Sequence, residues 1–194
     1  MRYKAILFDA DGVTIKESRR FSEVLAEQYD IPLEKISLFF ENEFKDCLVG
    51  RADVKEALAK YVESWGWKGT VDDLMAFWFT VGNEIDGPVA QAIKRLRAEG
   101  VSCYLVTNQE TYRGQHLCRM FDGLFDGAFV SGDIGCKKDE TAFFEHVFNH
   151  VGRGLEKHEM LLIDDDIKNV EAARKFGIST IHYQRPDDLN KINI

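Results

Sequence analysis

The first dozen residues constrain the fold more than any other stretch of the chain. An apolar run at residues 5–8 ends at Asp9, Ala10, Asp11 and Gly12. Because both faces of this short run are apolar and a turn signal follows at once, it predicts a buried strand. Two carboxylates at its end repel each other and lose hydration unless a cation or hydrogen-bond donors offset this. A solvated Asp-Gly turn is the alternative interpretation.

Four further apolar runs resemble the first one. They predict strands at residues 101–106, 128–130, 161–163 and 178–182. Segments with the apolar spacing of helices lie between or beside them, at residues 89–99, 115–121, 140–151 and 167–176. Strands that alternate with helices predict an α/β fold, with a Rossmann-like parallel sheet covered by helices on both faces.

The segment at residues 16–84 breaks this alternation because it contains no convincing strand. Groups of apolar residues with helical spacing begin near Phe21, Phe39, Val54 and Leu74, which predicts a bundle of roughly four short helices. We therefore expect a catalytic core of residues 1–15 and 85–194 and a helical cap of residues 16–84. The cap aromatics Trp65, Trp67, Phe77, Trp78 and Phe79 are expected mainly to form the core of the bundle.

Composition excludes several classes of protein. The net charge of -8 and the absence of a basic run argue against nucleic acid as a partner. No apolar stretch is long enough to span a bilayer, and the acidic balance would repel anionic membranes. The four cysteines lack zinc or disulfide spacing, which indicates a reducing, cytoplasmic location. A monomer or a homodimer is compatible with the sequence.

Polar side chains gather where the predicted strands end, which is where open α/β sheets bind ligands. They are Asp9 and Asp11, Thr107 and Asn108, Asp164 and Asp165, with Lys137 and Lys138 ahead of a helix. Taken singly, each group could be a turn, a solvated pair or a helix cap. Together, the carboxylates require a counter-ion, and oxygen ligands next to bound phosphate favour Mg²⁺.

These stretches resemble the four motifs of the haloacid dehalogenase-like superfamily, in the same order. Asp9-Ala10-Asp11-Gly12 is similar to its D-x-D-G motif, and Thr107 in L-V-T-N to its strand-ending Ser or Thr. Residues 131–138 resemble S-G-x-x-G-x-x-K, a register in which the lysine is Lys138. Leu162-Ile163-Asp164-Asp165 is similar to the acidic fourth motif. The helical insert resembles the superfamily's C1-type cap.

The resemblance implies a Mg²⁺-dependent phosphatase that acts on a small phosphorylated metabolite. Asp9 is then the nucleophile that forms an aspartyl-phosphate, and Asp11 is the general acid and base. Mg²⁺ is held by Asp9, the Asp11 carbonyl and Asp165, with Asp164 further out or reached through water. Thr107, Asn108 and Lys138 hold the phosphoryl oxygens. Asp139 stands where relatives commonly have proline, so Lys137 remains an alternative to Lys138.

Other substrates and functions stay open from the sequence. Arg51 in the cap either reaches the substrate or is a surface arginine, and a sugar phosphate is weakly favoured as the substrate. A phosphomutase would share the same core residues. A haloacid dehalogenase is disfavoured because those enzymes lack an acid at the position of Asp11. A receiver domain is disfavoured because it carries no helical insert.

Overall fold

Five parallel strands form the centre of the molecule in this computed structural model, which describes residues 2–16 and 19–192. The strands are β1 (Ala5–Asp9), β2 (Ser102–Thr107), β3 (Gly127–Val130), β4 (Met160–Asp164) and β5 (Ser179–His182). Their order across the sheet is β3-β2-β1-β4-β5. The five predicted strands are confirmed, and β1 and β4 are buried along their whole length.

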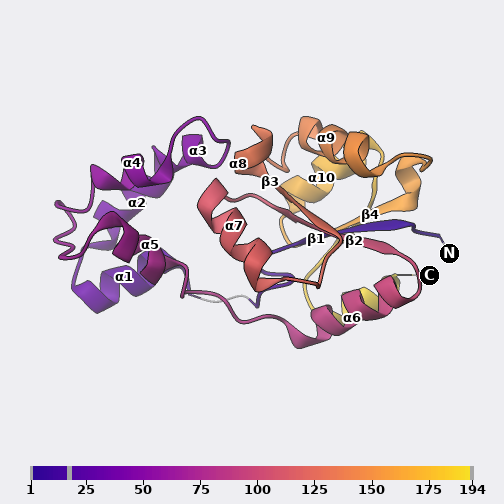
Figure 1. Cartoon of the computed structure of the whole chain (residues 1–194), viewed down its shortest axis with the longest axis horizontal. Coiled ribbons are helices and arrows are strands. Elements are labelled where there is room, and N and C mark those ends of the chain that lie inside the picture. The colour runs from indigo at the N-terminus through magenta and orange to yellow at the C-terminus, as the bar shows by residue number, and fades with distance from the viewer. Residues whose placement is uncertain (1, 17–18, 193–194) are drawn as a thin grey trace.

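Helices cover both faces of the sheet, as the sequence predicts (Figure 1). One face packs against α6 (Gly87–Ala98), α7 (Thr111–Met120) and the short helix η2 (Pro186–Lys191), and the other against α9 (Thr141–Val151) and α10 (Ile167–Phe176). Two shorter helices, α8 (Ser131–Ile134) and η1 (Lys157–Glu159), complete this part of the chain. In β1, Ile6 and Phe8 face the first set of helices, while Ala5 and Leu7 face the second. The α/β, Rossmann-like fold is therefore confirmed.

The segment that follows β1 folds into helices with a hydrophobic core of their own. They are α1 (Phe21–Tyr29), α2 (Leu33–Glu41), α3 (Phe44–Cys47), α4 (Val54–Ala59) and α5 (Val71–Trp78), and we call residues 19–81 the cap. The cap has five helices where about four were expected, because residues 39–47 do not form one helix. Asn42 leaves helical geometry, and its side-chain amide donates to the carbonyl of Leu38 at 2.7 Å.

The expected aromatic core of the cap is present. Trp65 and Trp78 are buried, and Trp67, Phe77 and Phe79 pack against the same cluster partly exposed. Phe21 stacks on Trp78 with ring centroids 5.0 Å apart. Aromatic pairs at such distances stabilise a core by more than the burial of their apolar area alone would. This cluster therefore forms a well-packed hydrophobic core for the cap.

Two neighbouring chain segments join the cap to the sheet. Ile15 and Ile85 form an antiparallel bridge, the amide of Lys16 donates to the carbonyl of Glu84, and the amide of Asp86 donates to the carbonyl of Thr14, both at 2.8 Å. The cap consequently lies beyond the carboxyl ends of the strands (Figure 1). All four cysteines are free thiols. Among the described residues, no helix combines the length and apolar character that crossing a membrane requires.

Candidate active site

Asp9 is the last residue of β1, and the register of the sheet sets its neighbours. Asp9 lies opposite Val106 of β2, one residue before Thr107, while Phe8 pairs with Ile163 of β4, one residue before Asp164. The turn that follows makes hydrogen bonds to both the side chain and the backbone of Asp9. The amide of Ala10 donates to Asp9 Oδ1 at 2.7 Å, and the hydroxyl of Thr14 donates to the Asp9 carbonyl at 2.7 Å.

Lys138 reaches Asp9 from the loop after α8. Its side chain is 1% exposed, and its Nζ lies 2.5 Å from Asp9 Oδ1 and 2.7 Å from Asp164 Oδ2. Burial alone would lower the pKa of Lys138, but the two carboxylates outweigh it and raise the pKa above its ordinary value. Lys138 therefore stays charged between the two acids. Lys137 instead pairs with Asp139 at 3.0 Å, away from this centre.

Burial raises the pKa of Asp9 well above its ordinary value. Lys138 opposes this effect, whereas Asp164 and Asp165 add to it. Loss of hydration on the side that faces the cluster raises the pKa of Asp165 as well, and Asp164 raises it further. The cluster therefore has more negative charge than its one lysine neutralises, and a bound cation would stabilise it.

Three of these carboxylates could share a metal ion. Oxygen atoms of Asp9, Asp164 and Asp165 all lie within 4.8 Å of one another. Asp164 is also bound elsewhere, because its Oδ1 accepts from the amide of Asp166 at 2.9 Å and from the side chain of Asn169 at 3.0 Å. The next residue, Asp166, is the N-cap of α10 and accepts from the amide of Lys168 at 2.9 Å. An all-oxygen acidic set fits a hard cation such as Mg²⁺.

Gly12 lets the loop after β1 approach Asp165. Its φ of +82° is a conformation that side chains rarely adopt, and a Cβ atom there would lie 2.4 Å from Asp165 Oδ2. Any larger residue would be strained and would push this carboxylate away. The glycine of the predicted D-x-D-G motif is therefore required by the close approach of the two loops.

The end of β2 supplies two further predicted residues. Thr107 is buried at the end of the strand, beside Val130 of β3. Asn108 follows it, and its side-chain oxygen accepts from the backbone amide of Lys138 at 2.8 Å. This bond fixes the Lys138 loop against β2, so the end of this strand and the lysine form one assembly.

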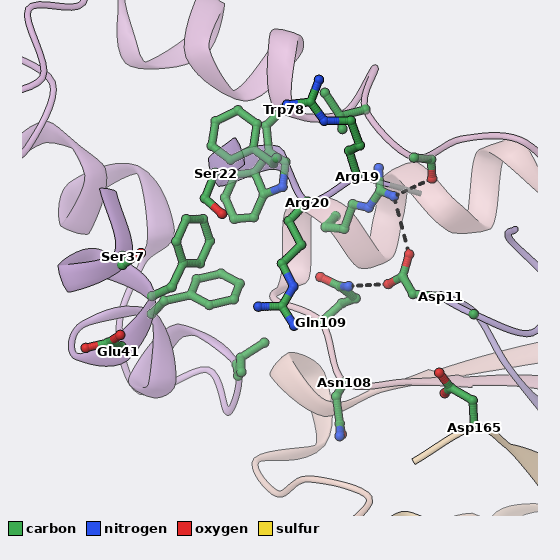
Figure 2. A pocket seen from close by; sticks show the side chains of 18 of the residues that line it. Asp11, Arg19, Arg20, Ser22, Ser37, Glu41, Trp78, Asn108, Gln109 and Asp165 are labelled. Atoms are coloured by element: carbon green, nitrogen blue, oxygen red, sulfur yellow. Dashed lines mark hydrogen bonds and ion pairs between the residues drawn. The ribbon is translucent and has the colours of Figure 1, made fainter. Parts of the chain in front are cut away.

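Asp11 lies at the edge of the cluster and is held by residues of α7 and of the loop before it. The Asp11 side chain is 49% exposed, and the side-chain nitrogen Nε2 of Gln109 donates to Asp11 Oδ2 at 2.7 Å. An Nη2 atom of Arg113 lies 3.8 Å from Asp11 Oδ1. Both interactions are drawn as dashed lines in Figure 2. Asp11 is thus oriented by two side chains that sequence reasoning missed.

Arg113 and Glu110 are buried charged residues at the start of α7. Arg113 is 4% exposed, and burial lowers its pKa. It donates to Asn83 Oδ1 at 3.0 Å and to the carbonyl of Gly82 at 3.4 Å, both in the segment that returns from the cap. Glu110 accepts from the amides of Tyr112 and Arg113 and so caps the helix. The sequence offers one signal for this pair, namely two opposite charges just after Thr107 and Asn108.

Arg51 is placed apart from the other candidate residues. Its side chain is 71% exposed and lies 3.7 Å from Asp46 Oδ1 within the cap. It lines a smaller hollow between the cap and α7 that also involves Tyr112, and not the cavity that Asp11 and Asp165 line. Of the alternatives for Arg51, the structure favours the surface arginine.

A cavity of about 710 Å³ lies between the acid cluster and the cap. Asp11, Asn108 and Asp165 line it on the side of the sheet, and residues of α1, α2, α3 and α5 line it on the side of the cap. Figure 2 shows Arg20 extending from the cap into this space towards Gln109. The volume is sufficient for a small organic molecule.

The sequence model of the haloacid dehalogenase-like hydrolase family matches residues 3–177. The chain therefore belongs to this family of hydrolases. The solved structure of HAD family enzyme bt-2542 from Bacteroides thetaiotaomicron, a complex with magnesium and inorganic phosphate, has a TM-score of 0.78 at 22% identity and covers 94% of both chains. A predicted HAD-like family hydrolase from Porphyromonas gingivalis has a TM-score of 0.75 at 22% identity, covering 93% of this chain and 91% of that one.

Two curated relatives match shorter stretches. Sesquiterpene phosphatase astK of Aspergillus oryzae is 30% identical over 99 residues, which is 50% of this chain and 50% of the relative. Drimenol cyclase drtB of Aspergillus calidoustus is 31% identical over 68 residues, which is 35% of this chain and 12% of the relative. The matched region therefore spans half the length of the first relative and about an eighth of the second.

Proposed function

We propose that the protein is a Mg²⁺-dependent phosphatase that hydrolyses a small phosphomonoester through an aspartyl-phosphate on Asp9. The observation that carries this proposal is the buried Lys138, held between Asp9 and Asp164 with Asp165 alongside. The charged Lys138 side chain is fixed among carboxylates at the carboxyl ends of the strands. This arrangement suits a phosphoryl group, whose oxygens need positive charge and hydrogen-bond donors.

The donor set supports Mg²⁺ as the cofactor. Asp9, Asp165 and the backbone carbonyl of Asp11 would hold the ion, with Asp164 behind them. When bound, Mg²⁺ neutralises charge on the phosphoryl oxygens, which makes attack by an anion on an anion possible. The Asp9 carboxylate, whose pKa burial raises without a metal, would become ionised next to the ion.

Asp9 and Asp11 divide the chemistry between them. A carboxylate oxygen of Asp9 attacks phosphorus while the bond to the leaving oxygen breaks, and Asp11 gives that oxygen a proton. Asp11 then takes a proton from a water molecule, whose oxygen attacks the phosphorus and releases inorganic phosphate and free Asp9. Gln109 and Arg113 hold the Asp11 carboxylate at the rim of the cavity, where a leaving group would lie.

Thr107, Asn108 and Lys138 would bind the phosphoryl group. Thr107 and Asn108 follow one another at the end of β2, next to Asp9 at the end of β1. Lys138 supplies the positive charge. Because the bond between Asn108 and the Lys138 amide joins these groups, the site is ordered before substrate arrives, which reduces the cost of reorganisation.

The comparisons support the class of reaction. The bt-2542 structure contains magnesium and inorganic phosphate, and the matched region of astK belongs to a protein named a sesquiterpene phosphatase. L-2-haloacid dehalogenase from Xanthobacter autotrophicus shares the fold, with a TM-score of 0.64 at 19% identity over 92% of this chain and 76% of that one. The presence of Asp11 beside Asp9 favours the phosphatase over the dehalogenase for this chain.

The test measures phosphate release from p-nitrophenyl phosphate and a panel of metabolite monoesters, with Mg²⁺ and with EDTA. We expect release that depends on Mg²⁺ and that EDTA abolishes. Asp9→Asn should lower turnover about a thousandfold or more while the circular dichroism spectrum stays unchanged. Full activity in EDTA, or substantial activity of the Asp9 variant, would contradict the proposal.

The same assay separates the phosphatase from a phosphomutase. A mutase returns the phosphoryl group from Asp9 to an organic acceptor, so it would release little phosphate and would show an acceptor-dependent discharge of labelled enzyme. We expect water to discharge the labelled Asp9 without an added acceptor.

A further inference from the structure

The cavity beside the acid cluster has a second, chemically different end. On the side of the sheet the cavity is lined by acids, amides and Arg113. The cap contributes a group of aromatic and aliphatic side chains, together with two arginines, Ser22, Ser37 and Glu41. The cap residues that carry this argument are Phe40, Phe44, Leu48, Trp78 and Val81. A molecule with its phosphoryl group at Asp9 would place its organic part against this second end, which we call the cap wall.

The cap wall is an ordered apolar surface. Trp78 packs edge-on against Phe40 with ring centroids 5.5 Å apart, and Phe44 lies 5.4 Å from Trp78. Phe40, Phe44, Leu48 and Val81 are each only partly buried. An apolar ligand in contact with these side chains would remove their exposed area from water. Binding would become more favourable in proportion to that area.

Four basic residues line the cavity as well, and three of them face acids of the protein. Lys16 pairs with Glu84, Arg19 pairs with Glu27 at 2.5 Å, and Arg113 lies near Asp11. The guanidinium of the fourth, Arg20, has no acidic partner among residues 2–16 and 19–192, although the Arg20 backbone amide donates to Glu23 Oε2 at 3.2 Å. Figure 2 shows the Arg20 guanidinium next to Gln109, whereas Glu41, which also lines the cavity, lies at its far end.

An unpaired guanidinium within a ligand cavity is suited to a carboxylate or a phosphate, which it can bind through two parallel hydrogen bonds. The reacting phosphoryl group already has Lys138, Thr107 and Asn108 in the proposed mechanism. Arg20 comes from the other side of the cavity, at the start of α1. Its charge is therefore available to a different part of the substrate.

We infer that the substrate is a phosphomonoester whose leaving group has an apolar body and carries a second anionic group, which Arg20 binds. This inference rests on the proposed phosphatase function. The apolar body lies against the cap wall, and the second anion is a carboxylate or another phosphate. It replaces the weak expectation of a sugar phosphate, because the hydroxyl groups of a sugar would leave the cap wall without an apolar partner.

The substrate class is tested with esters of primary alcohols, so that the leaving groups differ little in basicity. The series contains glucose 6-phosphate, n-hexyl phosphate, ω-carboxyalkyl phosphates of increasing length and the corresponding diol bisphosphates. We expect kcat/KM to rise about tenfold from the sugar to the alkyl ester, and about tenfold again for one length of chain with a second anion. The carboxylate and bisphosphate arms identify the preferred anion.

Variants then assign the second anion to its binding residue. Arg20→Met should remove the advantage of the dianionic esters and leave kcat/KM for n-hexyl phosphate within about twofold. Lys68→Met is the matched control, because Lys68 is an exposed cap lysine outside the cavities that Asp11 and Arg51 line. The control should keep the full ratio between the two kinds of ester.

The outcomes separate this inference from the proposed function. Mg²⁺-dependent release from p-nitrophenyl phosphate with no preference in the ester series would overturn the inference alone. An equal loss for every ester in Arg20→Met would also overturn it, since Arg20 would then bind the reacting phosphoryl group. Absence of release from every monoester, in folded protein with Mg²⁺, would overturn the phosphatase proposal and this inference with it.

Discussion

At the scale of single residues, two consecutive aspartates have different surroundings. Asp164 is fully buried, and both of its oxygens accept hydrogen bonds, from Lys138 on one side and from Asp166 and Asn169 on the other. Asp165 is exposed at the mouth of the cavity, against Gly12. The first therefore fixes the lysine, and the second is free to bind a cation.

This difference predicts different losses for two isosteric variants. Asp165→Asn should weaken Mg²⁺ binding by about 10–100-fold with little change in melting temperature, because it removes a ligand charge at an exposed position. Asp164→Asn should lower the free energy of unfolding by roughly 2–4 kcal/mol, because Lys138 loses one of its two buried partners. Calorimetric titration with Mg²⁺ and thermal unfolding measure the two effects. The reverse pattern would show that Asp164 is the principal ligand.

At the scale of elements, α7 joins the cap to the catalytic residues. Its first turn carries Arg113, whose guanidinium contacts Asn83 and Gly82 in the segment returning from the cap and lies near Asp11. In the same turn, the hydroxyl of Tyr112 donates to Asp53 of the cap at 2.9 Å. The position of α7 therefore determines both where the cap lies and how Asp11 is oriented.

Arg113 consequently acts as a positioning residue for Asp11. Arg113→Met should lower kcat for an alkyl phosphate about tenfold or more, and for p-nitrophenyl phosphate much less, because nitrophenolate leaves without a proton from Asp11. Arg113→Lys keeps the charge and should recover part of the loss. Melting temperatures of both variants separate this effect from loss of structure, since Arg113 is buried. Equal losses for both esters would contradict the positioning role.

The same helix shows where sequence reasoning fails at this scale. Periodicity predicts a start near Gln115, whereas α7 begins at Thr111. Gly114 resembles a helix breaker in sequence, but a Cβ there would lie 2.6 Å from a methyl carbon of Val130, so the helix needs glycine to pack on β3. Glu110 is also an unusual N-cap residue. The first cause is a tertiary contact that local patterns do not encode, and the second is a local cap formed by a residue type that rarely serves as one.

At the scale of the whole molecule, the acid cluster was predictable and the rest of the cavity was not. Parallel strands end at one edge, so apolar runs followed by Asp9, Thr107 and Asp164 predict that these residues meet. Arg20 and Gln109 lie in no motif. Arg20 reaches the cavity because the cap lies over the sheet, and Gln109 because its side chain turns towards Asp11; both depend on contacts between segments far apart in sequence.

The cap and the sheet have separate hydrophobic cores, and this arrangement has a consequence for unfolding. The five cap helices are 4–9 residues long and depend on their own cluster for stability, because isolated helices of that length are marginal. The proposed Mg²⁺ ligands, Asp9 and Asp165, belong to the sheet. Binding of the ion should therefore stabilise one unit and leave the other nearly unchanged.

The three tryptophans, Trp65, Trp67 and Trp78, all lie in the cap, so their fluorescence reports that unit alone. In urea we expect fluorescence to change first and far-ultraviolet circular dichroism to change in two steps, the first coinciding with the fluorescence. Mg²⁺ at about 100 times its Kd should stabilise the second step by about 2.7 kcal/mol and leave the first unmoved. Asp165→Asn should lose most of that shift. A single transition that Mg²⁺ moves in both signals would instead mean that the contacts of α7 make cap and sheet one cooperative unit.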